Sequence, residues 1–197
     1  MKIIVIGATG TIGGAVADAL ETEHCVIRAS RNGSTSVDLE QPASIDALFD
    51  TVGAVDAVIC CAANAPLTPL ASPSDDEFTL GLKGKLLGQV TLLRRAVDHV
   101  RDGGSITLTS GTFREPTPGG SFGALVNAGL EAFVRAAAIE MPRGLRANVV
   151  SPGWVTETLE KLGMDTRGGT PLSDVAHTYV EAVIGQMQGQ TLTPSPR

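Results

Sequence analysis

Three glycines near the start of the chain have the spacing of a loop that binds a phosphate group. They occur as Gly7-x-x-Gly10-x-x-Gly13, between an apolar run at 3–6 and an alanine-rich stretch at 11–20. The pattern predicts a strand, a tight turn and a helix, and the first backbone N–H groups of a helix have no partner within it. Such N–H groups bind anions well.

Each glycine of this turn has a separate purpose in a dinucleotide site. Gly7 permits the turn, Gly10 lets the backbone approach a pyrophosphate, and Gly13 lets the helix pack closely on the strand. We therefore predict a dinucleotide site, with a purely structural turn as the alternative interpretation. The expected contacts are the three glycines and three of the four residues between them: Thr9, Thr11 and Ile12.

The end of the second predicted strand, at 25–29, indicates which dinucleotide is bound. The strand is followed by Ser30 and Arg31 instead of an acidic residue. A carboxylate there would accept the ribose hydroxyls of NAD, whereas an arginine can pair with the 2′-phosphate of NADP. We expect NADP(H) to be preferred, with NAD(H) possible; a solvated loop charge is the alternative for Arg31. Asp38 and Leu39, which end the next short predicted strand, are expected beside the adenine.

The candidate cofactor-binding residues lie on a predicted alternation of strands and helices. Strands are predicted at 3–6, 25–29, 36–39, 55–60, 104–110, 145–150 and 190–193, and helices at 11–20, 42–49, 74–100, 121–141 and 173–187. This alternation predicts an α/β fold, a Rossmann-type doubly wound parallel sheet, with residues 1–197 as a single domain. Ligands of such sheets bind at the carboxyl ends of the strands. That edge would carry Cys61, Ala62, Ala63, Asn64, Ser110, Pro152 and Gly153.

Composition limits the classes of partner. The formal net charge of −6 and the pI near 5.0 argue against nucleic acid and anionic membranes as partners. No uninterrupted apolar run reaches the ~18 residues of a membrane span, and the N-terminus enters a strand directly, so we expect a cytoplasmic protein. Cys25, Cys60 and Cys61 lack metal or redox spacing and are predicted to be buried reduced thiols, with no metal site.

Together these motifs resemble the short-chain dehydrogenase/reductase family over essentially the whole chain. The matching segments are the glycine turn, Asp38, Cys61-Ala-Ala-Asn64, the strand that ends in Ser110, and Asn148-Val-Val-Ser-Pro-Gly153 followed by Thr156. The resemblance implies that Pro152, Gly153, Val155 and Thr156 hold the nicotinamide carboxamide. It also implies a homodimer or homotetramer formed through the helices at 74–100 and 121–141.

The active site departs from the family's pattern, which combines Ser, Tyr and Lys with an Asn from the preceding long helix. Ser110 is present, but Gly123 stands at the tyrosine position and Asn127 at the lysine position. Aligning Lys85-Leu-Leu-Gly88 with the family's Asn-Leu-x-Gly places Lys85 where the asparagine belongs. The sequence thus resembles a subgroup without the usual Tyr and Lys, whose function is undetermined; the chain's only tyrosine, Tyr179, is expected to pack in the last helix.

We hypothesise that Lys85, Ser110 and Asn127 line a site over the nicotinamide, with a surface charge as the alternative for Lys85. A lysine there could restore positive charge near the ribose and the developing oxyanion. Arg114 could bind a substrate carboxylate or be a solvated loop residue. Three classes of function stay open: an NADP(H)-dependent oxidoreductase of a small carbonyl, imine or enone substrate; a non-redox isomerase, cyclase or lyase; and a non-catalytic protein that senses the nucleotide or binds a partner.

Overall fold

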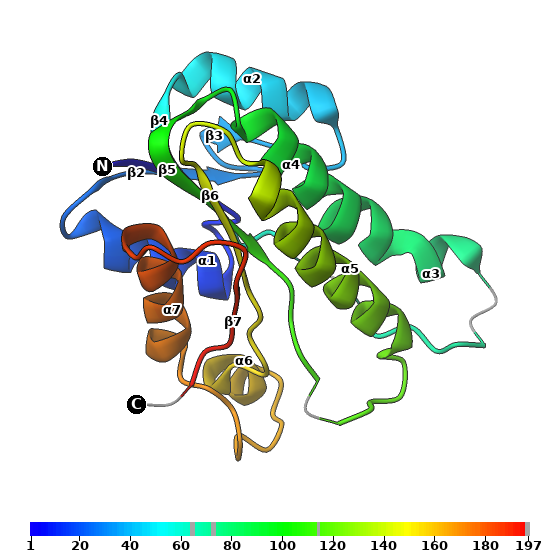
Figure 1. The fold of residues 1–197 in the computed structure, drawn as a ribbon. Helices are drawn as coiled ribbons and strands as arrows, with labels where there is room; N and C mark the ends of the chain where they lie inside the picture. The colour runs from blue at the N-terminus through cyan, green and yellow to red at the C-terminus, as the bar shows by residue number, and fades with distance from the viewer. Residues whose placement is uncertain (64–65, 72–73, 114, 196–197) are drawn as a thin grey trace.

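A parallel sheet of seven strands forms the centre of the molecule (Figure 1). The computed structural model describes residues 1–63, 66–71, 74–113 and 115–195, without the side chains of residues 77, 78 and 80. The predictions for Asn64 and Arg114 lie outside the described residues. The strand order is β3-β2-β1-β4-β5-β6-β7, and every neighbouring pair is parallel. The strands are β1 (Lys2–Ile6), β2 (Cys25–Ser30), β3 (Thr35–Ser36), β4 (Val55–Cys60), β5 (Val100–Thr109), β6 (Arg146–Val150) and β7 (Thr191–Leu192).

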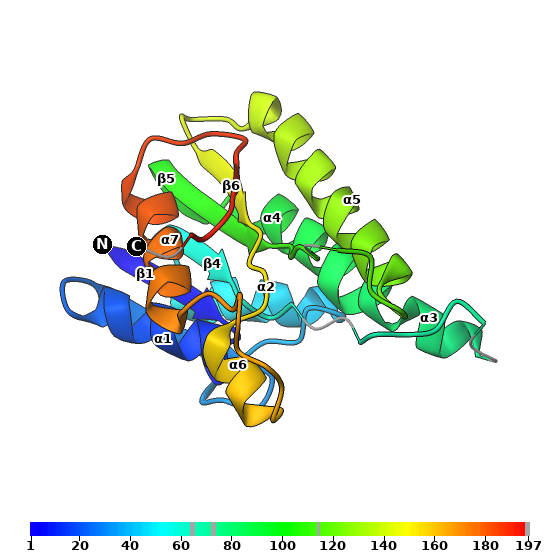
Figure 2. The same cartoon turned by 90° about the horizontal axis from the view of Figure 1, so that it is seen from below.

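Helices cover both faces of the sheet, which confirms the predicted doubly wound α/β fold. One face carries α1 (Thr11–Glu21) and α7 (Leu172–Ile184), and the other carries α2 (Pro42–Val52), α4 (Gln89–Ala96) and α5 (Ser121–Ala137) (Figures 1 and 2). The strand order reverses direction between β1 and β4, which is where such sheets bind ligands.

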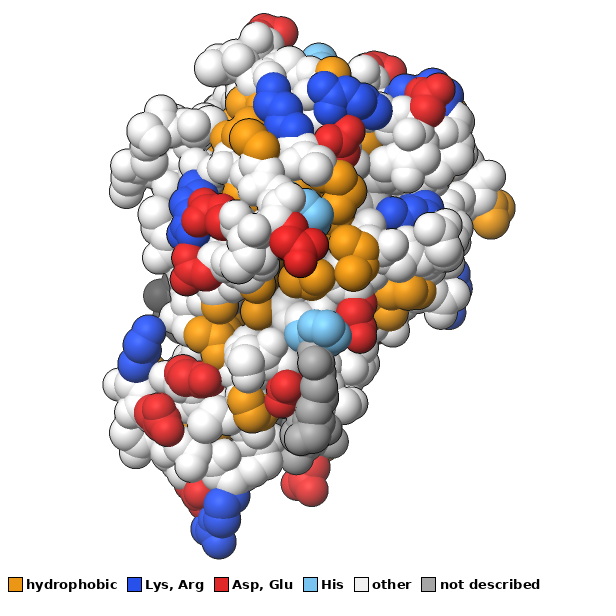
Figure 3. Space-filling view, turned by 90° about the vertical axis from the view of Figure 1, so that its left-hand side faces the viewer, with side chains coloured by type: hydrophobic (Ala, Val, Ile, Leu, Met, Phe, Trp, Pro, Cys, Tyr) orange, Lys and Arg blue, Asp and Glu red, His pale blue; other side chains and the backbone are white. Residues whose placement is uncertain are grey.

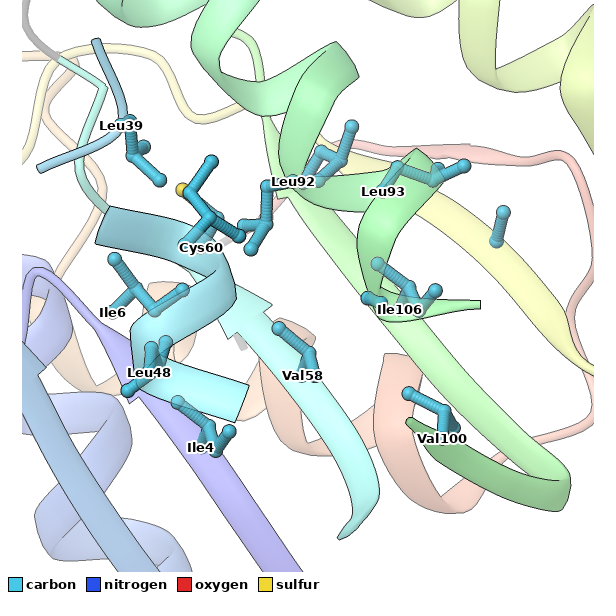
Figure 4. Close-up of a cluster of buried hydrophobic side chains, with 14 of the residues drawn as sticks. Ile4, Ile6, Leu39, Leu48, Val58, Cys60, Leu92, Leu93, Val100 and Ile106 are labelled. Atoms are coloured by element: carbon cyan, nitrogen blue, oxygen red, sulfur yellow. The ribbon is translucent and has the colours of Figure 1, made fainter. Parts of the chain in front are cut away.

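The central strands are buried on both faces, so their side chains divide between two cores. In β1, Ile4 and Ile6 belong to the cluster under α2, α4 and α5, whereas Ile3 and Val5 belong to the cluster under α1 and α7. Figure 4 shows the first cluster, where Ile4 and Ile6 lie near Leu48 of α2. This two-sided burial explains why the strands read as continuous apolar runs.

The polypeptide from 74 to 100, predicted as one helix, forms three helical segments and then enters β5. These are α3 (Asp75–Gly81), a π-helix η1 (Leu82–Gly88) and α4. A Cβ atom on Gly88 would lie 2.9 Å from Leu39 Cβ, so the glycine lets this helix pack closely on the segment after β3. Gly88 therefore packs closely against a residue of its own chain.

Other boundaries also differ from the sequence prediction. The strand predicted at 36–39 is reduced to β3, because Asp38 and Leu39 leave the sheet. The loop after β6 contains a short helix α6 (Thr156–Lys161), and a 3₁₀ turn η2 (Ala138–Glu140) ends the helix that begins at Ser121. The prediction that all three thiols are buried was wrong for Cys25, which is exposed at the start of β2.

The segment Ser121–Glu140 is long and apolar enough to span a membrane by length and composition, with a mean hydropathy of 1.4. Core helices of globular domains meet the same criterion. In this fold Val126, Leu130 and Val134 of α5 are buried against the sheet. The apolar character of the helix is therefore explained by its packing on β5 and β6.

Charged side chains of both signs are interspersed on the side of the molecule where the N-terminus and α1 lie (Figure 3). Arg28 of β2 illustrates the pattern, since its Nε donates a hydrogen bond of 2.7 Å to Glu21 at the end of α1. Exposed pairs of this kind contribute little to stability, because water and salt screen the attraction. The two apolar cores are the main source of stability.

Candidate functional site

The glycine turn between β1 and α1 has the geometry of an anion site. Gly7 has φ +83°, and a Cβ on Gly13 would lie 2.2 Å from the Gly7 carbonyl oxygen, so the helix can approach the turn only with glycine there. No side chain caps α1 at Gly10. The first N–H groups of α1 therefore face outward without a partner from a capping side chain and can bind phosphate oxygens.

A cavity of about 720 Å³ opens beside this turn, at the carboxyl ends of β1, β2 and β4. Most of the predicted cofactor contacts line it, together with Lys85. These predicted residues are Gly7, Thr9, Gly10, Thr11, Ile12, Gly13, Ser30, Arg31, Asp38, Leu39, Cys61, Ala62 and Ala63. Other residues of the same wall were not predicted from the sequence: Ile6, Asn32, Val37, Glu40, Pro66, Gly84 and Thr158.

At the end of the cavity formed by β2 and β3, Arg31 is available to a ligand. Its side chain is 70% exposed, and its Nε lies 3.9 Å from Asp38 Oδ1, so the ion pair is loose. The Asp38 carboxylate accepts the Glu40 N–H at 3.1 Å. A guanidinium with most of its donors free, beside a strand end without an acidic residue, fits the 2′-phosphate of NADP.

Four predicted residues after β6 do not line this cavity, although the resemblance assigned them to the nicotinamide: Pro152, Gly153, Val155 and Thr156. Thr158, two residues further along in α6, does line it. Pro152 accepts the Thr112 N–H at 3.0 Å, and Thr156, the first residue of α6, donates its N–H to Thr170 at 3.0 Å. Helix α6 nevertheless reaches the glycine turn, because Lys161 Nζ lies 3.3 Å from Thr11 Oγ1. The segment that begins at Pro152 therefore reaches the cavity through α6, beside the glycine turn.

Lys85 comes from the π-helix η1 and is held in place by Gln89. The fully buried Gln89 donates hydrogen bonds of 2.8 Å to the carbonyl oxygens of Lys85 and Thr109, and its Oε1 accepts the Thr109 N–H at 2.8 Å. Two of these bonds tie the helix to Thr109, the last residue of β5, and the third joins Gln89 to Lys85 within the helix. π-Helical turns are often found at functional sites.

The Lys85 ammonium and the Asn127 amide meet beside Gly111. A Cβ placed on Gly111 would lie 3.6 Å from Lys85 Nζ, 3.3 Å from Asn127 Nδ2 and 3.6 Å from Asn127 Oδ1. Both side chains are 7% exposed. The two predicted residues from different helices are thus brought together, and Lys85 is no surface charge.

Burial lowers the pKa of Lys85 to about 8, and the negative charge of Glu131 opposes part of this shift. Among the described residues, Lys85 Nζ has no ion pair within 4.0 Å and no hydrogen bond. A lysine with a pKa near 8 can both give and take a proton close to neutral pH.

Ser110 is buried and lines neither the cavity beside the glycine turn nor a second cavity between the loop after β5 and α5. Its hydroxyl donates a hydrogen bond of 2.8 Å to Glu131 Oε1, and the Ser151 hydroxyl donates one of 2.9 Å to the same oxygen. Glu131 lies one helical turn after Asn127 on α5, so the two side chains share a face. The sequence analysis did not identify Glu131 as a site residue, although its spacing from Asn127 was the available signal.

The described part of the chain offers no substitute for the tyrosine that the family places on α5. Gly123 occupies that position, and a Cβ there would lie 3.4 Å from the ring of Phe113. Tyr179 is fully buried on α7, where its hydroxyl lies 2.6 Å from Thr109 Oγ1 and burial raises its pKa well above the usual value. Tyr179 therefore packs in the core, as expected, and cannot act as the acid of the site.

A second cavity of about 470 Å³ lies between the loop after β5 and helix α5. Asn127 and Glu131 form its inner wall and Phe113 its apolar side. The remaining lining residues are Gly111, Thr112, Glu115, Pro116, Thr117, Gly120, Ser121, Ala124 and Ala128. Because Lys85 lines the first cavity and Asn127 the second, the two cavities meet at this pair of side chains.

Comparisons with known proteins identify the family and the fold. Residues 7–176 match a family model described as enoyl-(acyl carrier protein) reductase. The protein lin1944 from Listeria innocua is 36% identical, with a TM-score of 0.93 over 99% of this chain and 100% of that chain. A small-chain dehydrogenase in complex with NADPH is 28% identical, with a TM-score of 0.86 over 98% of this chain and 95% of that chain.

More distant structures share the fold alone. A short chain dehydrogenase from Burkholderia cenocepacia in complex with NADP is 20% identical, with a TM-score of 0.81 over 97% of this chain and 94% of that chain. A search of curated proteins found no match. The family model covers most of the chain, and the solved structures share its architecture over nearly their whole length. The chain therefore belongs to the short-chain dehydrogenase/reductase family.

Proposed function

We propose that the protein is an NADP(H)-dependent oxidoreductase that acts on a small substrate with a polarised double bond. The observation that carries this proposal is the joint lining of one cavity by the glycine turn, by Arg31 and by the buried Lys85. The cavity combines a phosphate site at one end with a group at the other end that can exchange a proton.

The residues around the cavity suggest how the cofactor is held. The backbone N–H groups at the start of α1 would bind the pyrophosphate, Arg31 and Ser30 the 2′-phosphate, and the segment at Asp38 and Leu39 the adenine. Pro152 and Gly153 would approach the carboxamide, as the resemblance implies. When bound, the nicotinamide supplies or accepts a hydride.

Lys85 would take over the proton transfer that the family's tyrosine performs elsewhere. Its pKa of about 8 leaves an ammonium group at neutral pH that can donate a proton as the substrate gains electrons. Ser110 is a less suitable donor, because its hydroxyl proton already serves the hydrogen bond to Glu131. Gln89 would act as a positioning residue by holding Lys85.

Cofactor titration tests the first part of the proposal. We expect NADPH to bind at least about tenfold more tightly than NADH, and Arg31→Ala to weaken NADPH binding about ten- to hundredfold because charge-assisted bonds are lost. NADH binding should change little. Arg94→Ala, on the exposed side of α4, is the matched control. Equal affinities of the wild-type protein for the two cofactors would contradict the proposed role of Arg31.

Isotope transfer tests the second part. NADPH that carries deuterium on the nicotinamide should pass the label to one face of a reduced product, and Lys85→Met should slow this transfer. The substrate panel would contain aldehydes, ketones, imines and enones. If NADPH binds but no label moves to any of them, the oxidoreductase proposal is wrong and a non-redox reaction or nucleotide sensing replaces it.

We also propose that copies of the chain associate through η1 and α5. The described surface of these helices exposes Leu87 and Leu125, at 51% and 59%. Exposed apolar side chains on adjacent helices are typical of interfaces. Sedimentation velocity of the full chain distinguishes a monomer, a homodimer and a homotetramer.

A further inference from the structure

The second cavity presents hydrogen-bond acceptors to a ligand. Asn127, which lines it, is more than nine-tenths buried, and its Oδ1 has no hydrogen-bond partner among the described residues. The charged side chains among the described lining residues are both carboxylates, Glu115 and Glu131. A buried acceptor without a donor is costly, so the site fits a ligand that brings donors.

The hydroxyl groups of Ser110 and Ser151, behind this wall, add no hydrogen-bond donors to the cavity. Ser110 and Ser151 both direct their protons at Glu131 Oε1, at 2.8 and 2.9 Å, so each hydroxyl has only its lone pairs left for another partner. No hydrogen bond to Glu131 Oε2 is found among the described residues. The inner wall therefore combines an amide oxygen with a carboxylate oxygen, both of which accept hydrogen bonds.

We propose that this cavity binds a small organic molecule through a protonated nitrogen, namely an imine in its iminium form or the amine formed from it. This proposal rests on the proposed NADP(H)-dependent function and names its substrate class. Asn127 Oδ1 and the Glu131 carboxylate accept the N–H groups, and Phe113 packs against the hydrocarbon part. Charge-assisted hydrogen bonds of this kind are among the stronger polar contacts.

A carbonyl substrate fits the same wall less well. Its oxygen only accepts hydrogen bonds, so it could use the donors of Lys85 Nζ and Asn127 Nδ2 but would leave the acceptors Asn127 Oδ1 and Glu131 without a donor. The missing tyrosine agrees with this view, because an imine nitrogen is far more basic than a carbonyl oxygen and takes a proton before reduction. The site then needs a modest acid and acceptors for the resulting cation.

The proton and the electrons balance for this substrate class. Lys85 Nζ gives its proton to the imine nitrogen and is left as a neutral amine, so the positive charge moves from Lys85 to the ligand. The iminium carbon then gains the hydride supplied by NADPH, the C=N π pair becomes the nitrogen lone pair, and NADP⁺ and a neutral amine result. Solvent returns the proton to Lys85.

Ligand binding to the full-length wild-type protein tests the proposal without turnover. Tetrahydroisoquinoline is protonated at neutral pH, and isochroman has the same rings with an ether oxygen in place of the N–H group. We expect the amine to bind at least about tenfold more tightly in calorimetric titrations, both without cofactor and with saturating NADP⁺. Equal binding of the two compounds would overturn the proposal.

Substitutions then locate the contact. Glu131→Gln should reduce the amine preference about tenfold, whereas the same change at the exposed Glu140, outside the cavity, should not. Asn127→Asp keeps an acceptor and should retain the preference, and Asn127→Leu should lose it. Circular dichroism shows that each variant is folded, and NADPH titration measures its cofactor binding separately. If Asn127→Leu weakens NADPH binding and leaves the amine preference intact, Asn127 serves the cofactor and the proposal is wrong.

Turnover separates this inference from the proposed function. Dihydroisoquinoline should receive deuterium from labelled NADPH with a higher kcat/KM than tetralone, its carbonyl counterpart. Faster transfer to tetralone would overturn the imine assignment and leave the oxidoreductase proposal standing. Absence of NADPH binding would overturn the proposed function, whereas the preference for the amine over isochroman is measured independently of it.

Discussion

Replacing Lys85 by methionine should make the protein's stability depend on pH in a defined way. Burial lowers the Lys85 pKa from 10.5 to about 8, so the folded protein gives up this proton more readily than the unfolded chain. Below pH 8 both states carry the proton, and the desolvated ammonium costs the wild-type fold about 3 kcal/mol. This cost disappears as the pH rises from 8 towards 10.5.

The expected magnitude follows from these two pKa values. Relative to Lys85→Met, the wild-type free energy of unfolding should increase by about 1.4 kcal/mol between pH 7 and pH 9, and by about 2.5 kcal/mol between pH 7 and pH 10. Other titrating groups contribute equally to both proteins and cancel in the difference.

Urea denaturation followed by circular dichroism measures this difference, and urea is preferable to guanidinium because it leaves the ionic strength low. Lys83→Met is the matched control, since Lys83 is exposed on the same π-helical segment and its variant should follow the wild-type pH dependence. A difference between wild type and Lys85→Met that stays constant from pH 7 to pH 10 would refute the conclusion that the ammonium is desolvated. It would also remove the physical basis for Lys85 as the proton donor.

Two further substitutions test the supports of the site. Gln89→Met should lower the free energy of unfolding by about 2–3 kcal/mol in urea at pH 7, because the buried Thr109 N–H loses its acceptor; a change below about 0.5 kcal/mol would contradict this role. Gly13→Ala should weaken NADPH binding at least about tenfold in a fluorescence titration, since its Cβ would lie 2.2 Å from a backbone oxygen. Gly14→Ala is the control, because its Cβ would lie 3.5 Å from the Ala8 carbonyl oxygen, an ordinary contact, and should leave NADPH binding unchanged.

The sheet could be predicted from the sequence because burial on both faces leaves a local signature. The runs at β1 and β4 are continuously apolar, and each is followed by a turn that the parallel topology brings to the same edge. The glycine turn was equally accessible, since its function depends on residues close together in the chain. The predicted cofactor contacts from Gly7 to Ala63 line one cavity for this reason.

The contacts that were missed join residues far apart in the sequence. Ser110 and Glu131 meet only because β5 ends beneath the middle of α5. The residues next to each of them in the sequence do not predict this hydrogen bond. The π-helix was missed because a helix with one wide turn has nearly the same apolar spacing as a regular one. Resemblance suggested that Lys85 and Asn127 are neighbours, but only the structure shows that both are buried.

The π-helix between Leu82 and Gly88 makes the direction of the Lys85 side chain depend on the number of residues in this segment. Each residue of an α-helix advances the side-chain direction by about 100°, and a π-turn accommodates an additional residue without lengthening the ladder of hydrogen bonds. Deleting one residue there would restore regular periodicity and rotate Lys85 relative to α4 by about that angle, away from Gly111. Two related chains with the same lysine could therefore differ in whether its side chain reaches the site. In a sequence alignment, the placement of a single-residue gap in this segment decides whether such a lysine is matched with Lys85.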